Sequence, residues 1–236
     1  MPVLTENTNY SWSLLDLVNR VRNECGIESV PSSAKDYDMR CVSVTNALND
    51  SVAELWRLVR WPWTRYRASM PWVAGTSEYN LPARFYRLAV PPEAVPGGGP
   101  MQELPADEWA MTGFGTQDPY PEGTPSTVVV YQNYFKVWPA PSAQHVASYP
   151  NTEYWYFREP PPRVYQDSDG IELPEELIPA CVAFGKWKLK LHIGDSDWRT
   201  HADEYERLKT EAMARYHVGR RANRMIPDDF TPSLWG

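Results

Sequence analysis

The chain has 236 residues and a formal net charge of −7 at pH 7, and five of the seven excess negative charges fall in residues 63–172. This balance argues against a protein that grips nucleic acid through its phosphates, because such binding needs a positive surface. Residues 1–10 are polar, and no apolar run approaches the length of about 20 residues needed to span a bilayer. We therefore expect a soluble protein made inside the cell, without a signal peptide or a membrane partner.

The three cysteines, Cys25, Cys41 and Cys181, are an odd number, and each lies in an apolar helical pattern. Such cysteines are typical of buried thiols in a reducing compartment, and no pair has metal-ligand spacing. The eleven tryptophans and fourteen tyrosines indicate either an aromatic core in a domain of strands or an extensive protein interface. Composition alone leaves both alternatives open.

The first predicted element is a helix over residues 14–25, in which apolar side chains recur on one face. Ser11 or Ser13 can cap its start, because a short hydroxyl side chain accepts a hydrogen bond from the first turn. Gly26 follows the helix and can take the left-handed conformation that commonly ends one.

A longer helix is predicted over residues 39–60, where apolar residues alternate at steps of three and four. Asp36 or Asp38 can cap its start. Pro62 prevents the helix from continuing and favours an extended conformation for Trp61. A rod of about 33 Å with one apolar stripe needs other helices to cover it.

Residues 63–172 have a different character and hold most of the 23 prolines of the chain. Short aromatic and β-branched runs predict strands at residues 64–73, 78–81, 85–90, 126–131, 134–138 and 152–158. Gln132–Asn133 is the predicted turn of a hairpin, and residues 91–125 are predicted to form a long loop with a short helical turn near residues 106–109. Short strands with irregular links favour a small antiparallel sandwich or barrel inserted between helices.

Helical character returns at residues 173–176, where a proline and two glutamates suit the first turn of a helix. The apolar pattern continues to Leu191 and covers so much of the surface that this helix should be well buried. Pro179 marks either the true start of the helix or a kink in its first turn.

A last helix is predicted over residues 198–222, after a break at Gly194 and a cap at Asp195 or Ser196. Residues 223–236 have no helical period, two prolines and spaced apolar side chains, a pattern typical of a segment that binds a neighbouring subunit. The candidates for contact with a partner are Trp61, Arg220, Arg221, Arg224, Met225, Ile226, Phe230, Leu234 and Trp235.

These elements predict an α+β protein in which about four helices from the two ends of the chain form a bundle. The predicted helical domain comprises residues 1–62 and 173–222, and the inserted domain of strands comprises residues 63–172. Residues 223–236 form an extended C-terminal tail.

The sequence shows no convergent set of catalytic side chains, and we expect neither an enzyme nor a bound metal or cofactor. His192 and His201 flank the turn between the last two helices and are a conceivable metal pair for a hydrolase. They lack the His-x-x-x-His spacing that would fix the geometry of such a site. The glycines at residues 97–99 are not followed by the Lys-Ser/Thr of a phosphate loop.

A carbohydrate- or cell-surface-binding module built on the strands is the alternative from another functional class. Trp109, Trp138 and Trp155 could stack on sugars, whereas the simpler explanation places their rings inside a thin sandwich. A sugar-binding module also leaves the four helices and the apolar tail without a role.

Short stretches spread over nearly the whole chain form an ordered set. They are LLDLVNRVRNECG from Leu14, Asn46-Ala-Leu-Asn, Trp61-Pro-Trp, Tyr79-Asn-Leu-Pro, Phe85-Tyr-Arg-Leu, Val137-Trp-Pro-Ala-Pro, Tyr154-Trp-Tyr-Phe-Arg-Glu-Pro-Pro and Leu173-Pro-Glu-Glu-Leu. In this order and spacing they resemble the head-to-tail adaptor (connector) proteins of tailed bacteriophages, especially the tail-tubular-A-like adaptors of short-tailed phages. Pro179 and the long loop over residues 91–125 depart from that pattern.

The resemblance implies a structural subunit of the virion, located at the head–tail junction and assembled in the host cytoplasm. It implies a cyclic ring of about twelve copies with side-by-side contacts between them. The partners would be the portal protein, a tail or nozzle protein, and DNA that passes through the channel without sequence-specific binding. The helices would build the ring, the strands would face the tail, and residues 223–236 would reach toward the portal. A negative channel would let DNA slide rather than stick.

Overall fold

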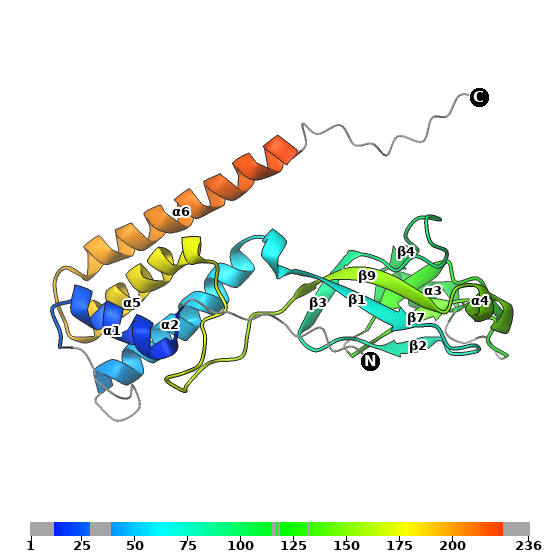
Figure 1. The fold of residues 1–236 in the computed structure, drawn as a ribbon, viewed down its shortest axis with the longest axis horizontal. Coiled ribbons are helices and arrows are strands. Elements are labelled where there is room, and N and C mark those ends of the chain that lie inside the picture. Colours follow the sequence, from blue (N-terminus) through cyan, green and yellow to red (C-terminus); the bar gives the residue numbers. More distant parts are fainter. Residues whose placement is uncertain (1–11, 29–38, 115–116, 118, 132, 224–236) are drawn as a thin grey trace. The chain divides into compact units, whose positions relative to one another are not determined.

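The computed structural model describes residues 12–28, 39–114, 117, 119–131 and 133–223 (Figure 1). The chain is a mixed α+β protein, as the sequence predicts, with six α-helices in the described part. Its contacts divide it into two compact units. The helical unit comprises Met1–Val59 and Pro160–Gly236, and the strand unit comprises Arg60–Glu159.

Helix α1 spans Leu14–Glu24 and begins with a capping box. Ser13 Oγ accepts a hydrogen bond from the Asp16 N–H over 3.2 Å, and the Asp16 carboxylate accepts one from the Ser13 N–H, also over 3.2 Å. Gly26 then takes a positive φ of 72°, which glycine adopts without the steric cost of a Cβ. Both predicted ends of the helix are confirmed, and Ser13 is its cap.

Helix α2 spans Met39–Leu58, so it begins at the predicted residue and ends slightly before the predicted Arg60. Its fully buried apolar side chains lie on the predicted stripe: Cys41, Val44, Leu48 and Leu55. Asp36 and Asp38, the candidates for its cap, lie outside the described residues.

Helix α5 spans Ile178–His192 and follows a 3-10 turn, η3, at Glu175–Leu177. Pro179 occupies the second position of α5. The N–H of that position has no intrahelical acceptor, so proline is tolerated there. Pro179 therefore marks the start of the helix and does not kink its interior.

Helix α6 spans Trp198–Asn223 and is the longest helix of the described part. Gly194, with a positive φ of 73°, lies at the predicted break between α5 and α6. The Asp195 carboxylate accepts a hydrogen bond from the N–H of Asp197 over 3.0 Å. Asp195, one of the two predicted caps, thus binds the turn that leads into α6.

Helix α5 is the centre of the helical unit, because it packs against α1, α2 and α6 (Figure 1). Its buried apolar side chains are Ile178, Ala180, Cys181, Val182, Ala183, Phe184 and Leu189. Gly185 permits a close approach to α1, since a Cβ built on it would stand 2.8 Å from Val21 Cγ2. The prediction that this helix is well buried is confirmed.

The described part of the strand unit contains three small sheets. The first has the strand order β1-β9-β3, with β1 at Arg65–Pro71, β9 at Asn151–Arg158 and β3 at Phe85–Val90. The second has the order β2-β7-β6-β4, with β2 at Glu78–Asn80, β7 at Tyr134–Trp138, β6 at Thr127–Val130 and β4 at Gln102–Leu104. The third pairs β5 (Glu122–Gly123) with β8 (Ala140–Pro141).

The two larger sheets enclose one core and form a small two-layered sandwich. The first sheet contributes Met70, Leu88, Tyr154 and Tyr156, and the second contributes Tyr79, Val128, Phe135 and Val137. The described strands form open sheets and no closed barrel, so the barrel alternative is wrong. The expectation of purely antiparallel pairing is also wrong, because β4 runs parallel to β6 and β5 runs parallel to β8.

Helix α3, at Ala106–Thr112, covers the other face of the second sheet. Its Trp109 packs with Leu104 and Val129 in a second, smaller core. Successive residues of a strand point to opposite faces, so Val128 enters the first core and Val129 enters the second. The strand unit is therefore built of three layers: the first sheet, the second sheet and α3.

Two stretches predicted to lack regular structure contain short elements. The predicted loop at residues 91–125 holds β4, β5 and an α3 that extends past the expected helical turn. Helix α4, at Ala143–Ser148, was not predicted at all. Ser142 caps it, its Oγ accepting a hydrogen bond from the His145 N–H over 3.2 Å.

Candidate interaction surfaces

Lys186 ties three helices of the helical unit together. From α5 its ammonium lies 3.2 Å from a Glu24 carboxylate oxygen on α1 and 2.9 Å from one of Glu204 on α6. Burial lowers the pKa of Lys186, but hydrogen bonds to the two carboxylates outweigh this effect and raise it overall. Burial likewise raises the pKa of Glu204, yet its hydrogen bonds with Lys186 and His201 hold that pKa below the ordinary value. These groups stabilise the charged forms of one another.

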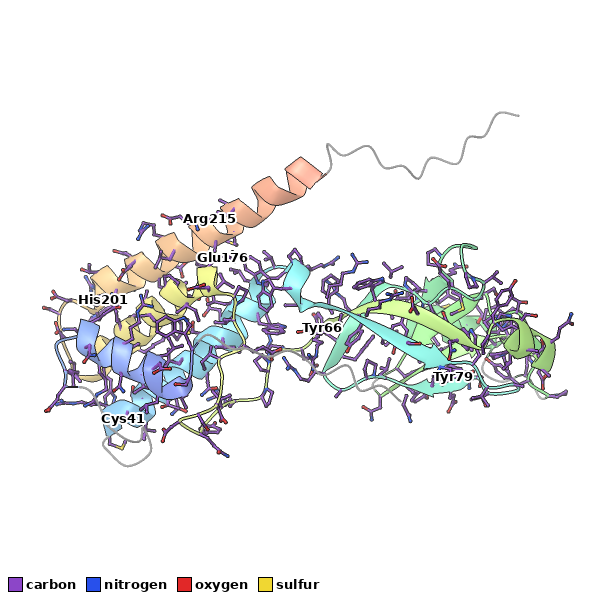
Figure 2. The ribbon with its side chains drawn as sticks, in the orientation of Figure 1. Cys41, Tyr66, Tyr79, Glu176, His201 and Arg215 are labelled. Carbon is purple, nitrogen blue, oxygen red and sulfur yellow. The ribbon has the colours of Figure 1, made fainter. Side chains whose placement is uncertain are left out.

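His201 belongs to this ion network rather than to a metal site. Its Nδ1 lies 3.4 Å from Glu204 Oε2, and Figure 2 labels it on α6. His192 is exposed at the end of α5. Across the part of the chain that the structure describes, no group of three or more His, Cys, Asp or Glu side chains is placed to hold a metal ion. The suggested pair of histidines therefore gains no support as a metal centre.

Residues 160–172 form a connecting segment that a polar clamp fixes to α2. Asn49, a buried residue of α2, donates from Nδ2 to the Val164 carbonyl over 2.9 Å and accepts from the Val164 N–H over 2.8 Å. Beside this clamp, Arg163 forms an ion pair with Asp50 at 2.6 Å. A cavity of about 40 Å³ remains between the segment and α2.

The connecting segment is also fixed to the start of α1. The Leu14 N–H donates to the Asp169 carbonyl over 2.9 Å, and the Ile171 N–H donates to the Trp12 carbonyl over 3.0 Å. The segment contains no helix or extended strand. Its backbone groups instead form hydrogen bonds with the start of α1 and with Asn49 of α2.

Most of the predicted partner-binding residues lie outside the described side chains. Arg220 and Arg221 belong to the last turns of α6, of which only the backbone is described, and residues 224–236 lie beyond the described part. Trp61 is described: it precedes the 3-10 turn η1 (Pro62–Thr64) in the extended conformation favoured before proline. Its ring stacks on Trp63 with the centroids 6.1 Å apart, and only 5% of the residue is exposed. A partner would therefore find little of Trp61 to cover.

The tryptophans considered for sugar binding do not form a shared platform. Trp109 is 1% exposed in the second core. Trp138 stacks on Phe114 with the ring centroids 4.1 Å apart. Trp155 is the exposed one, and the Arg65 guanidinium lies over its ring, 4.6 Å from the centroid. The rings of Trp109 and Trp138 therefore pack against other side chains of the same chain.

The outer face of the first sheet carries arginine and aromatic side chains, and we call it the arginine face. It is formed by Arg65, Arg67, Arg87, Trp155, Phe157 and one acidic residue, Glu153. Arg65 is registered with Phe157 and Arg67 with Trp155 across β1 and β9, while Arg87 is registered with Phe157 across β3 and β9. Side chains directly opposite on paired strands share one face of a sheet. This face is basic in a chain whose net charge is negative.

Neither the clamp at Asn49 nor the arginine face was predicted from the sequence. Asn49 is part of the Asn46-Ala-Leu-Asn stretch, and a polar residue beside an apolar helical stripe was the available signal. The arginines of β1 alternate with other residues, but their aromatic partners come from a strand far along the chain.

In the described residues, no helix is long and apolar enough to cross a membrane. The model of the family described as SU10 adaptor protein matches residues 12–228, which span both units. No curated protein matches the chain. The resemblance to phage head-to-tail adaptors is confirmed by the family match.

Proposed function

Because the chain belongs to the SU10 adaptor protein family of phage head-tail adaptors, we propose that it is a ring subunit that joins the portal vertex to the tail. The observation that carries the proposal is the match over residues 12–228, which includes every described helix and strand. A phage adaptor is a structural protein of the virion, so assembly and not chemistry is the activity to explain.

The two units suit a division of labour. We assign ring building to the helical unit, whose helices come from both ends of the chain, and contact with a tail or nozzle protein to the strand unit. Lys186 and its two carboxylates hold α1, α5 and α6 together, so the helical unit can present a fixed surface to its neighbours. A fixed surface lowers the entropy cost of association.

The C-terminal tail is assigned to the portal. Helix α6 has 26 residues and α5 has 15, so their lengths are about 39 Å and about 22 Å. The two helices pack against each other from the same turn, and α6 therefore continues beyond its partner (Figure 1). We assign the apolar side chains of residues 224–236, which follow α6 in the sequence, to contact with the portal.

The charge of the chain fits a channel through which DNA moves. A net charge of −7 disfavours tight binding to phosphates, and in a ring the charge is multiplied by the number of copies. DNA would pass the ring without sequence-specific contacts. A ring of about twelve copies is the stoichiometry that we propose, with heterologous contacts between neighbours.

Electron microscopy of the full-length protein mixed with the portal protein of the same phage tests the proposal. The expected result is a ring of this protein coaxial with the portal and closed around a central channel. A protein that stays monomeric with the portal at all concentrations, or that binds away from the portal axis, would contradict the proposed function.

The sugar-binding alternative is not favoured by the geometry. Trp109 is buried in the second core, Trp138 is partly buried and packs against that core, and Trp155 is already stacked with Arg65. No described observation points to a second candidate function.

A further inference from the structure

Two guanidinium groups of the arginine face are held in place by aromatic rings rather than by acidic partners. Arg65 lies over the Trp155 ring at 4.6 Å, and Arg87 lies over the Phe157 ring at 5.4 Å. Stacking of this kind orders a long side chain while its N–H groups still point outward. The residues therefore form a preordered basic surface.

The hydrogen-bond donors of this face are mostly unused. Among the described residues, the Arg65 guanidinium has no hydrogen-bond acceptor, and Arg87 Nε is buried without one. Arg67 is paired with Glu153, the one acidic side chain of the face. Three arginines and one glutamate leave a surplus of two positive charges. Each guanidinium has five N–H donors, so this face is suited to bind carboxylates from outside the unit.

The opposite side of the same unit carries the complementary chemistry. Helix α3 buries Trp109 and exposes Asp107, Glu108 and Met111, and Met111 is 84% exposed. Asp107 and Met111 are four residues apart and share one stripe of the helix. The two acids suit the first turn of any helix, but the exposed methionine is not explained by the dipole. No basic residue occurs in α3.

The layers of the unit place these two surfaces on opposite outer sides. Tyr154 and Tyr156 of β9 point into the first core, so Trp155 and Phe157 point away from it. The second sheet lies on the other side of that core, and α3 covers the far face of the second sheet. The basic aromatic surface is therefore the outer face of the first sheet. The acidic surface with the exposed methionine lies on the opposite side of the unit, on α3.

We propose that the arginine face of one subunit binds α3 of the neighbouring copy, with Arg65 and Arg67 facing Asp107 and Glu108, and Met111 packing against the part of Trp155 that stays exposed beside Arg65. The arginine face has a surplus of two positive charges, and α3 carries two negative charges. A thioether against an aromatic ring is also a favourable contact. Two different surfaces on opposite sides make a heterologous contact, which repeats from copy to copy and closes into a ring when the rotation permits. This inference rests on the proposed ring and adds a contact between neighbouring strand units to the ring contacts assigned to the helical unit.

Charge reversal in the full-length protein tests the interface. Arg65→Glu and Asp107→Arg should each weaken self-association by about tenfold or more, because each places like charges across the contact. The chain that carries both changes should recover assembly, since every interface then holds a reversed pair. An equimolar mixture of the two single variants should also assemble, because native and reversed pairs alternate around the ring. Sedimentation velocity at low salt and electron microscopy on portal rings provide the measurement.

The matched control is Glu122→Arg, an identical change of charge at an exposed residue of β5 in the same unit. It should assemble as the wild type does. If both single variants assemble into rings as the wild type does, the proposed interface is wrong, while the proposed function stays intact. Loss of assembly in both single variants without recovery in the double variant would also overturn the pairing. A change in duplex DNA binding by Arg65→Glu with unchanged assembly would assign the face to DNA instead.

Discussion

At the scale of single residues, Gly185 shows how the helical unit depends on a missing side chain. A Cβ at this position would stand 2.8 Å from Val21 Cγ2 and 3.5 Å from Leu48 Cδ2. Val21 is fully buried on α1 and β-branched, so its side chain cannot rotate away cheaply. Three helices meet at this glycine, and its role is to let them pack closely rather than to give the backbone flexibility.

Gly185→Ala is therefore expected to lower the free energy of unfolding of the helical unit. Overpacking costs about 1–3 kcal/mol, and the better helix propensity of alanine returns about 1 kcal/mol. Urea unfolding followed by circular dichroism at the helical band measures the difference. In a double-mutant cycle with Val21→Ala, the two changes should be less than additive because the second makes room for the first. A Gly185→Ala variant more stable than the wild type would contradict this packing.

At the scale of elements, the connecting segment is held by one buried amide. Asn49 donates to the carbonyls of Thr45 and Val164 and accepts from the Val164 N–H, so both ends of its side chain are used. An aspartate there keeps the acceptor but loses the donor and sets a buried charge beside two carbonyl oxygens.

Asn49→Asp is expected to destabilise the helical unit by about 1–3 kcal/mol and to loosen residues 160–172. Limited proteolysis should then cut this segment faster than in the wild type, and thermal unfolding should report the loss of stability. Asn46→Asp is the control: it makes the same change one turn earlier on α2, at a half-buried residue outside the clamp. Equal sensitivity of the two variants would count against the clamp.

The four helices of the helical unit were predictable from the sequence because each carries its own period and its own end signals. Ser13, Gly26 and Gly194 act on their nearest neighbours, and the structure confirms all three. Strands β4, β5 and β8 have two or three residues each, too few to show a period, and two of their pairings are parallel. Their positions depend on the partner strand, which no local pattern contains.

The interaction surfaces were harder to predict for a related reason. The pairing of Asn49 with Val164 joins residues 115 positions apart. The arginine face exists only because β1 and β9 pair in one register, which places Arg67 opposite Trp155. A shift of that register by one residue would send the same side chains to the core. Contacts set by tertiary pairing are invisible to helical and strand periodicity.

At the scale of the whole molecule, the two compact units and the segment that we assign to docking are different parts of the chain. The two units have separate cores, and the last turns of α6 extend beyond α5. A docking segment can be removed without loss of the fold if its role is to bind a partner.

Deletion of residues 223–236 is therefore expected to leave thermal unfolding of the full chain unchanged and to abolish docking on the portal protein. The physical reason is that Phe230, Leu234 and Trp235 offer apolar surface whose burial on a partner offsets the entropy of ordering the segment. Replacing these three residues with alanine should reproduce most of the loss, whereas Asp228→Asn in the same segment should bind nearly as the wild type does. Co-sedimentation with assembled portal rings provides the measurement. A truncated chain that docks as well as the full chain would show that the portal is bound through the folded units instead.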